Sequence, residues 1–495
     1  MIAARRWRPS LNWPIALPVI AGALLAVGVG ELVCAVVALI AGDGGVLAFG
    51  LPAVVLIPVG VGGLLLSRSP SAMPLRPRDG FFAVTMAWVV AAAAGAAPFL
   101  IEGTFSSVVN AYFESMSGFT TTGATLLRTV EDQPDAILLW RSLTQWLGGV
   151  GIVVLVVAIA PATGLAGQRA FYAETSGVTA DRLTPRIAQT AKIIWAVYLT
   201  LTTVGLLAYW AAGMTPWDAI NHSLTTIATG GFSTRTASIA AFDSLAIELV
   251  AIVLMIASGI NFAFYWLVLR DRRRIWPQAA EVRAYLAIIA VVTAALTLAL
   301  VVSDAMGVGS ALRASSFTVV SVITTTGFTT VDFDTWHAFA RLTLLLLMFV
   351  GACAGSTTGG MKVIRVLLLG KVAGQELRRQ LQPSAVQVLR LPGRVYPEAV
   401  RRGVLSFFLL YMAVFAVGSL AMAAIGLDEV TAISSVAATL NVIGPGLADI
   451  GPTQNFASIP PGGLWLLSAL MLAGRLEVFT VIVLLIPAFW RARAA

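Results

Sequence analysis

The 495-residue sequence has few of the side chains on which enzymes and soluble domains depend. Charged residues make up only 11% of it, whereas a soluble domain contains about 25%. The two cysteines, Cys34 and Cys353, lie in apolar sequence, which excludes a disulfide framework and a cysteine metal site. The two histidines, His222 and His337, are far apart. Since a membrane enzyme needs paired acids, a histidine–glutamate metal set or an activated serine, we predict that the protein is not an enzyme.

Long apolar runs are what the sequence does contain. Hydrophobic residues make up 58% of the chain, and the mean hydropathy is +0.89. A helix needs roughly 20 apolar residues to cross a bilayer. Apolar runs lie at 13–41, 46–66, 81–101, 136–160, 193–212, 245–269, 284–302, 342–354, 403–425 and 464–489. They predict an all-α membrane protein with about ten crossings, and the first run is too long for a removable signal peptide.

The net charge of +8 reflects membrane topology and not nucleic-acid binding. The basic residues form no patch with interleaved aromatic residues. They gather in alternate connections between the apolar runs, at 5–8, 68–78, 169–186, 270–274, 371–394 and 491–493. The opposite connections carry acids such as Glu131 and Asp332. By the positive-inside rule the basic side is cytoplasmic, so both termini are expected in the cytoplasm and the lipid bilayer is the expected surrounding.

Four of the outward connections share one pattern, a half-length apolar stretch followed by a threonine- and glycine-rich string. The strings are 120–124, 228–232, 324–328 and 441–447. Their first glycines, Gly123, Gly230, Gly327 and Gly444, recur at intervals of roughly 100 residues. One such string alone is typical of an ordinary turn or a helix-packing motif. Four in register favour re-entrant segments around a common pore, because non-helical backbone inside a membrane must be buried in protein or line a watery cavity.

These strings have the chemistry of an alkali-cation filter. Glycine lets backbone carbonyls turn toward an axis and replace the hydration shell of a cation, and threonine adds a hydroxyl oxygen. A short helix before each string would direct its negative C-terminal end toward the same axis. The candidate ligands, mainly through backbone carbonyls, are Thr121, Thr122, Gly123, Thr229, Gly230, Thr325, Thr326, Gly327, Val442, Ile443 and Gly444.

Two further features interrupt the apolar pattern. Small residues fill 351–360, where a continuous helix would be costly because each glycine loses about 1 kcal/mol relative to alanine; a surface for close helix packing is the alternative. Arg475 lies within the last apolar run. An unpaired cation there would be expensive, so it should face a watery cavity or a partner, either Glu477 or the small-residue segment. A packing ion pair away from the pore is the alternative.

Several motifs together resemble the Trk/Ktr/HKT superfamily of potassium transporters, in its TrkH-like bacterial branch. They are Ser117–Thr125, Gln145–Gly151, Ala228–Ser233, Gly259–Phe262, Thr324–Phe328, Gly355–Lys362 and Gly474–Glu477. The resemblance covers nearly the whole chain. It implies two N-terminal helices and four helix–pore helix–filter–helix repeats around a pseudo-fourfold pore, with potassium as the transported ion. The predicted units are 1–70 for the N-terminal pair, then repeats at 71–186, 187–277, 278–397 and 398–495.

The resemblance also implies a gate, partners and a location. The gate would combine an intramembrane loop with a pore arginine and a nearby lysine, at Gly355, Ser356, Thr357, Thr358, Gly359, Gly360, Lys362 and Arg475. A homodimer with one pore per subunit is expected in the bacterial cytoplasmic (inner) membrane. A cytosolic ring of nucleotide-binding, TrkA-like regulatory subunits is expected as a separate polypeptide.

Two other functions stay open. One is a secondary solute transporter, which would show inverted repeats and a midplane site. The other is the potassium-binding subunit of an ATP-driven pump. The remaining membrane-embedded polar residues are interpreted as structural: Glu31, Glu114, Asp218, His222, Glu248, Asn261 and Asp428. The resemblance implies that a glycine at the first filter position of all four strings goes with a preference for potassium over sodium. Pro445 makes the fourth string the most divergent.

Overall fold

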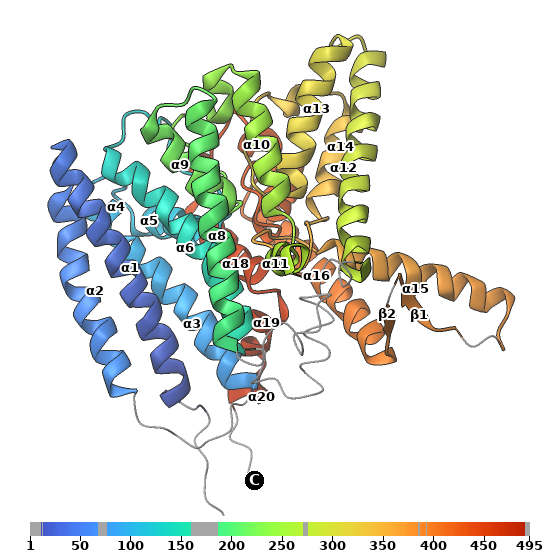
Figure 1. The fold of residues 1–495 in the computed structure, drawn as a ribbon, viewed down its shortest axis with the longest axis horizontal. Helices are drawn as coiled ribbons and strands as arrows, with labels where there is room; N and C mark the ends of the chain where they lie inside the picture. The colour runs from blue at the N-terminus through green and yellow to red at the C-terminus, as the bar shows by residue number, and fades with distance from the viewer. Residues whose placement is uncertain are drawn as a thin grey trace, which may run out of the picture.

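The computed structural model describes residues 11, 13–67, 77–159, 187–270, 276–384, 387–392 and 394–490. These residues are almost entirely helical (Figure 1). Helices α1 (Trp13–Ala41) and α2 (Val46–Leu66) pack together at one edge of the molecule. Their outward side chains are apolar and uncovered, since Leu39, Ile40 and Leu66 are 70%, 80% and 80% exposed. A surface of this kind is stable against lipid and not against water.

Four helical units follow this pair within the described residues. Repeat 1 contains α3 (Pro77–Gly95), α4 (Ala97–Ile101), α5 (Val108–Phe119) and α6 (Asp135–Ile159). Repeat 2 contains α8 (Ile187–Ala211), α9 (Pro216–Ile227), α10 (Leu245–Ser258) and α11 (Phe262–Arg270). Repeat 3 contains α12 (Trp276–Val302), α13 (Val308–Ile323), α14 (Ala338–Met348) and α15 (Val363–Leu381). Repeat 4 contains α16 (Glu398–Ala424), α17 (Glu429–Leu440), α18 (Pro461–Arg475), α19 (Phe479–Leu485) and α20 (Pro487–Trp490). The predicted boundaries at 70 and 186 lie outside the described residues.

Six described helices are each long and apolar enough to cross a membrane, and α10 with α11 forms a seventh span bent by 89°. The expected runs in the second halves of repeats 2, 3 and 4 are therefore not single helices. Repeat 2 bends between α10 and α11, repeat 3 divides at the segment 349–362, and repeat 4 divides at Glu477, whose φ is 57°. The sequence showed the break in repeat 3 but not the other two.

Most residues of each of the short helices α5, α9, α13 and α17 are buried. Local sequence defines where two of them begin. The Thr215 side chain accepts a hydrogen bond from the Asp218 amide, with Pro216 as the first helical residue of α9. The Asp428 side chain accepts from the amides of Val430 and Thr431 at the start of α17. The interpretation of Asp218 and Asp428 as helix-start acids is confirmed.

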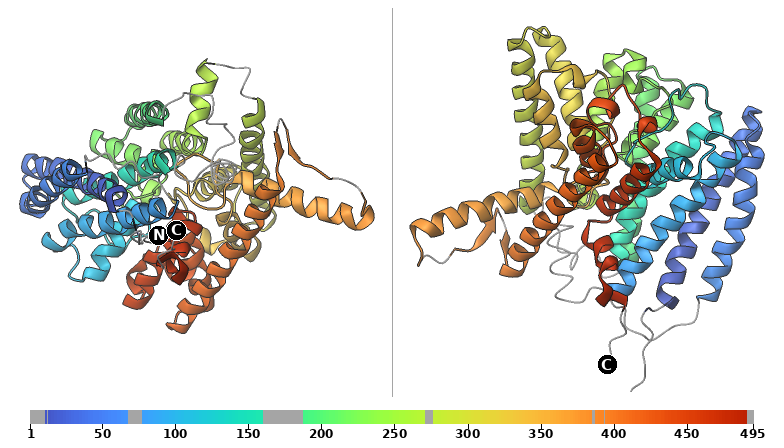
Figure 2. Two further views of the ribbon diagram at one scale, coloured as in Figure 1. Left: turned by 90° about the horizontal axis from the view of Figure 1, so that it is seen from below. Right: turned by 180° about the vertical axis from the view of Figure 1, so that it is seen from behind.

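A projecting arm extends sideways from the bundle (Figure 2). It consists of α15 and the antiparallel strands β1 (Leu389–Leu391) and β2 (Arg394–Tyr396), in which Leu389 pairs with Tyr396. Buried side chains from the hairpin, α15 and α16 form a small apolar core: Ile364, Leu368, Val372, Leu389, Leu391, Tyr396, Val400 and Val404. The arm is therefore anchored to the bundle by apolar packing.

The outer loops join each repeat to the next. The Val130 amide donates to Thr236 Oγ1 at 2.9 Å, linking repeats 1 and 2. The Ala240 amide donates to the Thr329 carbonyl at 3.2 Å, linking repeats 2 and 3. Repeat 4 reaches both remaining neighbours, because the Ala448 amide donates to Asp334 Oδ2 at 3.1 Å and the Phe456 amide donates to the Thr125 carbonyl at 2.9 Å. The four repeats thus close a ring.

Candidate cation pore

Each short helix ends in the same strained backbone turn. The residue that leaves the helix has a left-handed φ in all four repeats: 57° at Thr121, 55° at Thr229, 53° at Thr325 and 61° at Val442. In repeat 1 the Thr121 amide donates to the Gly118 carbonyl at 2.9 Å and the Thr122 amide to the Ser117 carbonyl at 2.8 Å. The other three repeats form the equivalent pair of bonds. This ending normally carries glycine, and a non-glycine residue there costs about 1–3 kcal/mol, a strain typical of functional sites.

A glycine with positive φ follows two residues later in every repeat. The φ angles are 78° at Gly123, 80° at Gly231, 80° at Gly327 and 100° at Gly444. The intervening residues, Thr122, Gly230, Thr326 and Ile443, are not in the left-handed region. All four strings therefore share one alternating backbone, although their sequences differ.

These four glycines close a second ring, at the level of the strings themselves. A Cβ atom added to Gly123 would lie 2.1 Å from the Gly230 carbonyl oxygen, and one on Gly231 would lie 2.0 Å from that of Thr326. Added to Gly327, it would lie 1.9 Å from the Ile443 oxygen. Added to Gly444, it would lie 2.7 Å from the Thr122 oxygen. Each glycine is thus in direct contact with a backbone carbonyl of the next repeat, and a side chain at any of the four would break that contact.

The backbone corrects the register of the second string. The sequence analysis treated the first glycine of each string as equivalent, which aligned Gly230 with Gly123, Gly327 and Gly444. The glycine with the equivalent φ is Gly231, and Gly230 instead supplies the ring carbonyl that Thr122, Thr326 and Ile443 supply elsewhere. Two adjacent glycines made the choice ambiguous in the sequence. Gly231 is therefore a residue of the ring that the sequence prediction missed.

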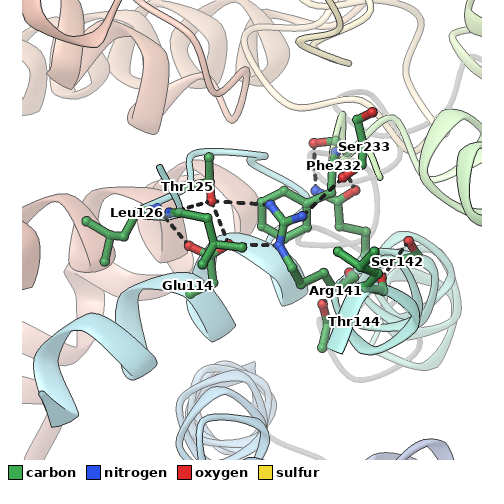
Figure 3. A network of polar contacts seen from close by, with 12 residues as sticks. Glu114, Thr125, Leu126, Arg141, Ser142, Thr144, Phe232 and Ser233 are labelled. Atoms are coloured by element: carbon green, nitrogen blue, oxygen red, sulfur yellow. Dashed lines mark hydrogen bonds and ion pairs between the residues drawn. The ribbon is translucent and has the colours of Figure 1, made fainter. Parts of the chain in front are cut away.

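A buried ion pair supports the first string from behind (Figure 3). Arg141 Nε donates to Glu114 Oε1 at 3.0 Å, and both side chains are nearly inaccessible. Glu114 also accepts from the Leu126 amide at 2.9 Å and from Thr125 Oγ1 at 2.8 Å. The guanidinium reaches repeat 2 as well, because Arg141 Nη1 donates to the Ser233 carbonyl at 3.2 Å. The pair holds the segment that follows the first string against repeat 2.

Gln145 and His222 support the second string. Gln145 Nε2 donates to the Gly230 carbonyl at 2.7 Å, and its Oε1 accepts from the Phe232 amide at 3.1 Å. His222 Nδ1 lies 2.8 Å from the Asp218 carbonyl oxygen, and its Nε2 lies 2.9 Å from Ser233 Oγ. His222 is therefore a hydrogen-bonded scaffold residue, as interpreted from the sequence. The sequence analysis named Gln145 only as part of a motif and did not anticipate its contact with Gly230.

The small-residue segment lies on the inner side of the ring, which we define as the side where the short helices end. Thr229 Oγ1 donates to Thr357 Oγ1 at 3.3 Å, and the Gly359 amide donates to Thr325 Oγ1 at 2.8 Å. A Cβ on Gly359 would lie 2.4 Å from the Asn441 carbonyl oxygen. The segment therefore contacts repeats 2, 3 and 4. In repeat 1, Thr121 Oγ1 is buried and has no hydrogen-bond partner within the described part of the chain.

Arg475 ends α18 and holds this segment in place. Its Nη1 donates to the Thr357 carbonyl at 2.5 Å, and its Nη2 donates to the Gly148 carbonyl of α6 at 3.0 Å. The side chain is 3% exposed. Of the two partners that the sequence left open, the segment 351–362 is the one bonded. Glu477 instead pairs with Arg365 of α15. Both bonds of Arg475 go to backbone carbonyls, so its charge is dispersed and not neutralised by a carboxylate.

Lys362 closes the inner end of the segment. Its Nζ donates to the carbonyl and, at 2.9 Å, to the Oγ1 of Thr358. Ser356 Oγ lies 2.8 Å from Thr358 Oγ1. The predicted gate residues are thus brought together: 355–360 form one turn of buried small residues, and Arg475 and Lys362 each bond to it.

A cavity opens on the outer side of the ring. Its lining includes all four ring glycines together with residues of the outer loops, among them Ser233, Arg235 and Gln454. Arg235 forms an ion pair with Asp218 at 2.9 Å. A path from outside therefore reaches the glycine ring, and the segment 351–362 lies across the ring's inner side.

Comparison with known proteins identifies the family. The sequence profile of the TrkH family, described as a cation transport protein, matches residues 53–492. The chain belongs to the TrkH family. The Trk system potassium uptake protein TrkH of Vibrio parahaemolyticus is 43% identical over 424 residues, covering 84% of this chain and 87% of that protein. The Trk system potassium uptake protein TrkI of Halomonas elongata is 36% identical over 490 residues, covering 98% of both.

A solved structure shows the same fold. The crystal structure of the potassium transporter TrkH from Vibrio parahaemolyticus has a TM-score of 0.87 and 41% sequence identity, and the match covers 96% of this chain and 99% of that one. The resemblance inferred from the motifs is confirmed, as are the all-α membrane fold and the expectation that the protein is a transporter and not an enzyme. As a member of the TrkH family the chain is a cation transport protein.

Proposed function

We propose that this TrkH family member carries potassium into the cell through the glycine ring. The ring closure carries the proposal: four strings of different sequence share one strained backbone, and each glycine contacts a carbonyl of the next repeat. Such strain persists only where the surrounding structure enforces it. A closed set of backbone oxygens is the ligand arrangement that replaces the hydration shell of an alkali cation. The names of the relatives, which are potassium uptake proteins, favour potassium as the transported ion.

We propose the strings as the ion ligands, with the carbonyls of Thr122, Gly230, Thr326 and Ile443 as the central set. The short helices support this assignment, because their C-terminal ends converge on the ring and carry partial negative charge. Imperfect symmetry should limit selectivity. Val442 replaces a threonine in repeat 4, and Pro445 Cδ lies 3.0 Å from where a Cβ on Gly327 would be.

The segment 351–362 and Arg475 are proposed as the gate. Buried side chains and backbone of this segment lie directly against three of the four strings. The guanidinium adds an electrostatic barrier for cations on the same side. Displacing the segment would either break the bond from Arg475 to the Thr357 carbonyl or move the arginine side chain with it, so the two parts are coupled.

Assembly and orientation complete the proposal. The distribution of basic residues supports an orientation with both termini in the cytoplasm. A homodimer in the bacterial cytoplasmic membrane is proposed from the family resemblance. The relatives are components of a Trk system, which favours a separate regulatory ring of TrkA-like, nucleotide-binding subunits on the cytoplasmic face.

The two alternatives have less support. A solute transporter with inverted repeats would bind its substrate at the midplane between two halves, but here four similar strings converge. The potassium-binding subunit of an ATP-driven pump would share the filter, but the relatives found over nearly the whole chain are uptake proteins.

Cation flux into liposomes containing the purified full-length protein tests the proposal. Uptake of potassium and rubidium should exceed that of sodium and lithium, and Gly123→Ser should reduce the preference because its side chain would overlap the Gly230 carbonyl. Gly50→Ser is the matched control, because no atom lies within 4 Å of a Cβ at Gly50 in α2. Absence of cation flux from the wild-type protein, with a regulatory ring supplied, would overturn the proposal.

A further inference from the structure

The segment 351–362 is bound by one acid that has no part in the pore proposal. Glu281 lies near the start of α12 and is 8% exposed. Its Oε1 accepts a hydrogen bond from the Ala354 amide at 2.8 Å. Glu281 therefore binds the chain directly before the turn formed by 355–360.

The two ends of the segment 351–362 are adjacent. The Gly351 amide donates to the Met361 carbonyl at 2.9 Å, and the Val363 amide donates to the Ala352 carbonyl at 3.1 Å. Between these ends, Gly355 and Gly360 have φ angles of 77° and 64°. Glycine adopts such angles without strain and changes conformation easily, so these two positions are natural hinges. The bond from Ala354 to Glu281 lies next to the first hinge.

Two neighbouring contacts support the same region. The Cys353 amide donates to the Gly259 carbonyl at 3.0 Å, and the Phe262 amide donates to the Gly355 carbonyl at 3.3 Å. Gly259 and Phe262 both lie at the bend between α10 and α11. Glu281 differs from these contacts because its acceptor is a buried side chain, which a substitution can remove.

We propose that Glu281 is a positioning residue that keeps the segment 351–362 on the inner side of the glycine ring and so sets how often the pore is open. The inference rests on the proposed gate. With the carboxylate present, the Ala354 amide next to the first hinge keeps its hydrogen bond only while the segment is in place. Without it, this buried amide loses its acceptor, which is costly, and the segment gains by moving toward water. Loss of the carboxylate therefore favours the open arrangement.

Single-channel recording of the full-length protein in planar bilayers measures this directly. Glu281→Ala should raise the open probability about tenfold, which corresponds to a shift of 1.4 kcal/mol in the closed–open equilibrium. Glu281→Gln should raise it less, because its amide oxygen still accepts from one backbone amide. Unitary conductance and the potassium-to-sodium ratio should not change, since the ring is untouched. Glu31→Gln, which replaces another buried acid, in α1, is the matched control and should leave the open probability unchanged.

Thiol labelling gives a second readout that does not depend on ion flux. Cys353 lies inside the segment and is fully buried, and the other cysteine, Cys34, can be replaced with alanine. A charged thiol reagent added on the cytoplasmic side should modify Cys353 faster in Glu281→Ala than in the parent protein. Folding of each variant is checked by size-exclusion chromatography.

The outcomes separate the two proposals. If wild-type protein carries no cation, the transport proposal fails, and the labelling rates still decide whether Glu281 holds the segment. If wild-type protein conducts but folded Glu281→Ala has an unchanged or lower open probability and unchanged labelling, the role of Glu281 is overturned. A changed ion preference in Glu281→Ala would also overturn it, because the residue would then act on the ring and not on the segment.

Discussion

On the outer side of the glycine ring, each pair of neighbouring repeats is joined by a hydrogen bond between their loops. The inner side is different, because one segment from repeat 3 and one arginine from repeat 4 occupy it. Ion coordination benefits from equal contributions by all four repeats, whereas a gate needs only one movable part. The comparison indicates that the repeats share one backbone at the ring, where we propose that the ion is bound, and differ on the inner side, where we propose that flow is controlled.

The largest effect is expected at the ring itself. Gly327→Ala would place a methyl group 1.9 Å from the Ile443 carbonyl oxygen at a φ of 80°. Overlap and backbone strain together should cost more than about 3 kcal/mol, and we expect potassium flux to fall about a hundredfold. Gly309→Ala in α13 is the control, because no atom lies within 4 Å of its Cβ. If folded Gly327→Ala shows the same flux and selectivity as the wild type, the outer and inner sides are not separated by a close-packed ring.

The buried pair behind the first string should dominate stability. Glu114→Leu leaves Arg141 buried without its carboxylate, which should cost about 3–5 kcal/mol of unfolding free energy. The double variant Glu114→Leu with Arg141→Met should recover most of that loss. Thermal unfolding in detergent measures both. As a control, Glu376→Gln breaks the more exposed pair with Arg401 and should cost less than about 1 kcal/mol. Equal losses of unfolding free energy in Glu114→Leu and Glu376→Gln would argue against a special role for the Glu114–Arg141 pair.

The inner side should respond in the opposite direction. Arg475→Ala removes the bond to the Thr357 carbonyl and the positive charge near the ring, so potassium flux should rise about tenfold. Arg402→Ala, which removes an exposed arginine from α16, should not change it. Flux in liposomes is the measurement. A decrease in flux with normal folding would mean that Arg475 supports the open pore, and the contrast between the two sides would no longer hold.

The smallest effect is expected in the outer loops at low pH. Burial works to raise the pKa of Glu131, but hydrogen bonds from the side chain and backbone of Thr236 outweigh it and hold the pKa below its ordinary value of 4.5. Its contribution to the junction of repeats 1 and 2 is therefore present above pH 4.5 and is lost as the pH falls through the lower folded value. Melting temperatures between pH 6 and pH 3 should fall less steeply in Glu131→Gln than in the wild type. The neighbouring exposed acid gives the control Asp132→Asn, and an identical slope in Glu131→Gln would refute the prediction.

The sequence predicted the parts of this structure that depend on local composition. Apolar runs specify the membrane helices, and the four strings stand out because one pattern recurs at intervals of roughly 100 residues. The uninterrupted small residues at 351–360 predicted a break in repeat 3. The bends at Gly259 and Glu477 escaped notice, because a single glycine or acid within an apolar run does not by itself predict a break.

Contacts between distant segments could not be predicted in this way. Glu281 meets Ala354 across 73 residues, and Gln145 meets Gly230 across 85. Composition says nothing about such pairs. The register of the second string also failed for a physical reason, since Gly230 and Gly231 are chemically identical and only the backbone φ separates them. Arg475 was expected to need a partner, but the choice between Glu477 and the segment 351–362 depended on which way α18 ended.

The closure of the ring has a consequence for how the protein is made. The contact between Gly444 and Thr122 joins the last repeat to the first, so it cannot form until almost the whole chain has left the ribosome. Repeats inserted earlier have a string with at least one missing neighbour and hence no complete set of carbonyls. A partly synthesised chain therefore lacks the closed ring that we propose as the cation pathway, and selective conduction through it has to wait for the last repeat.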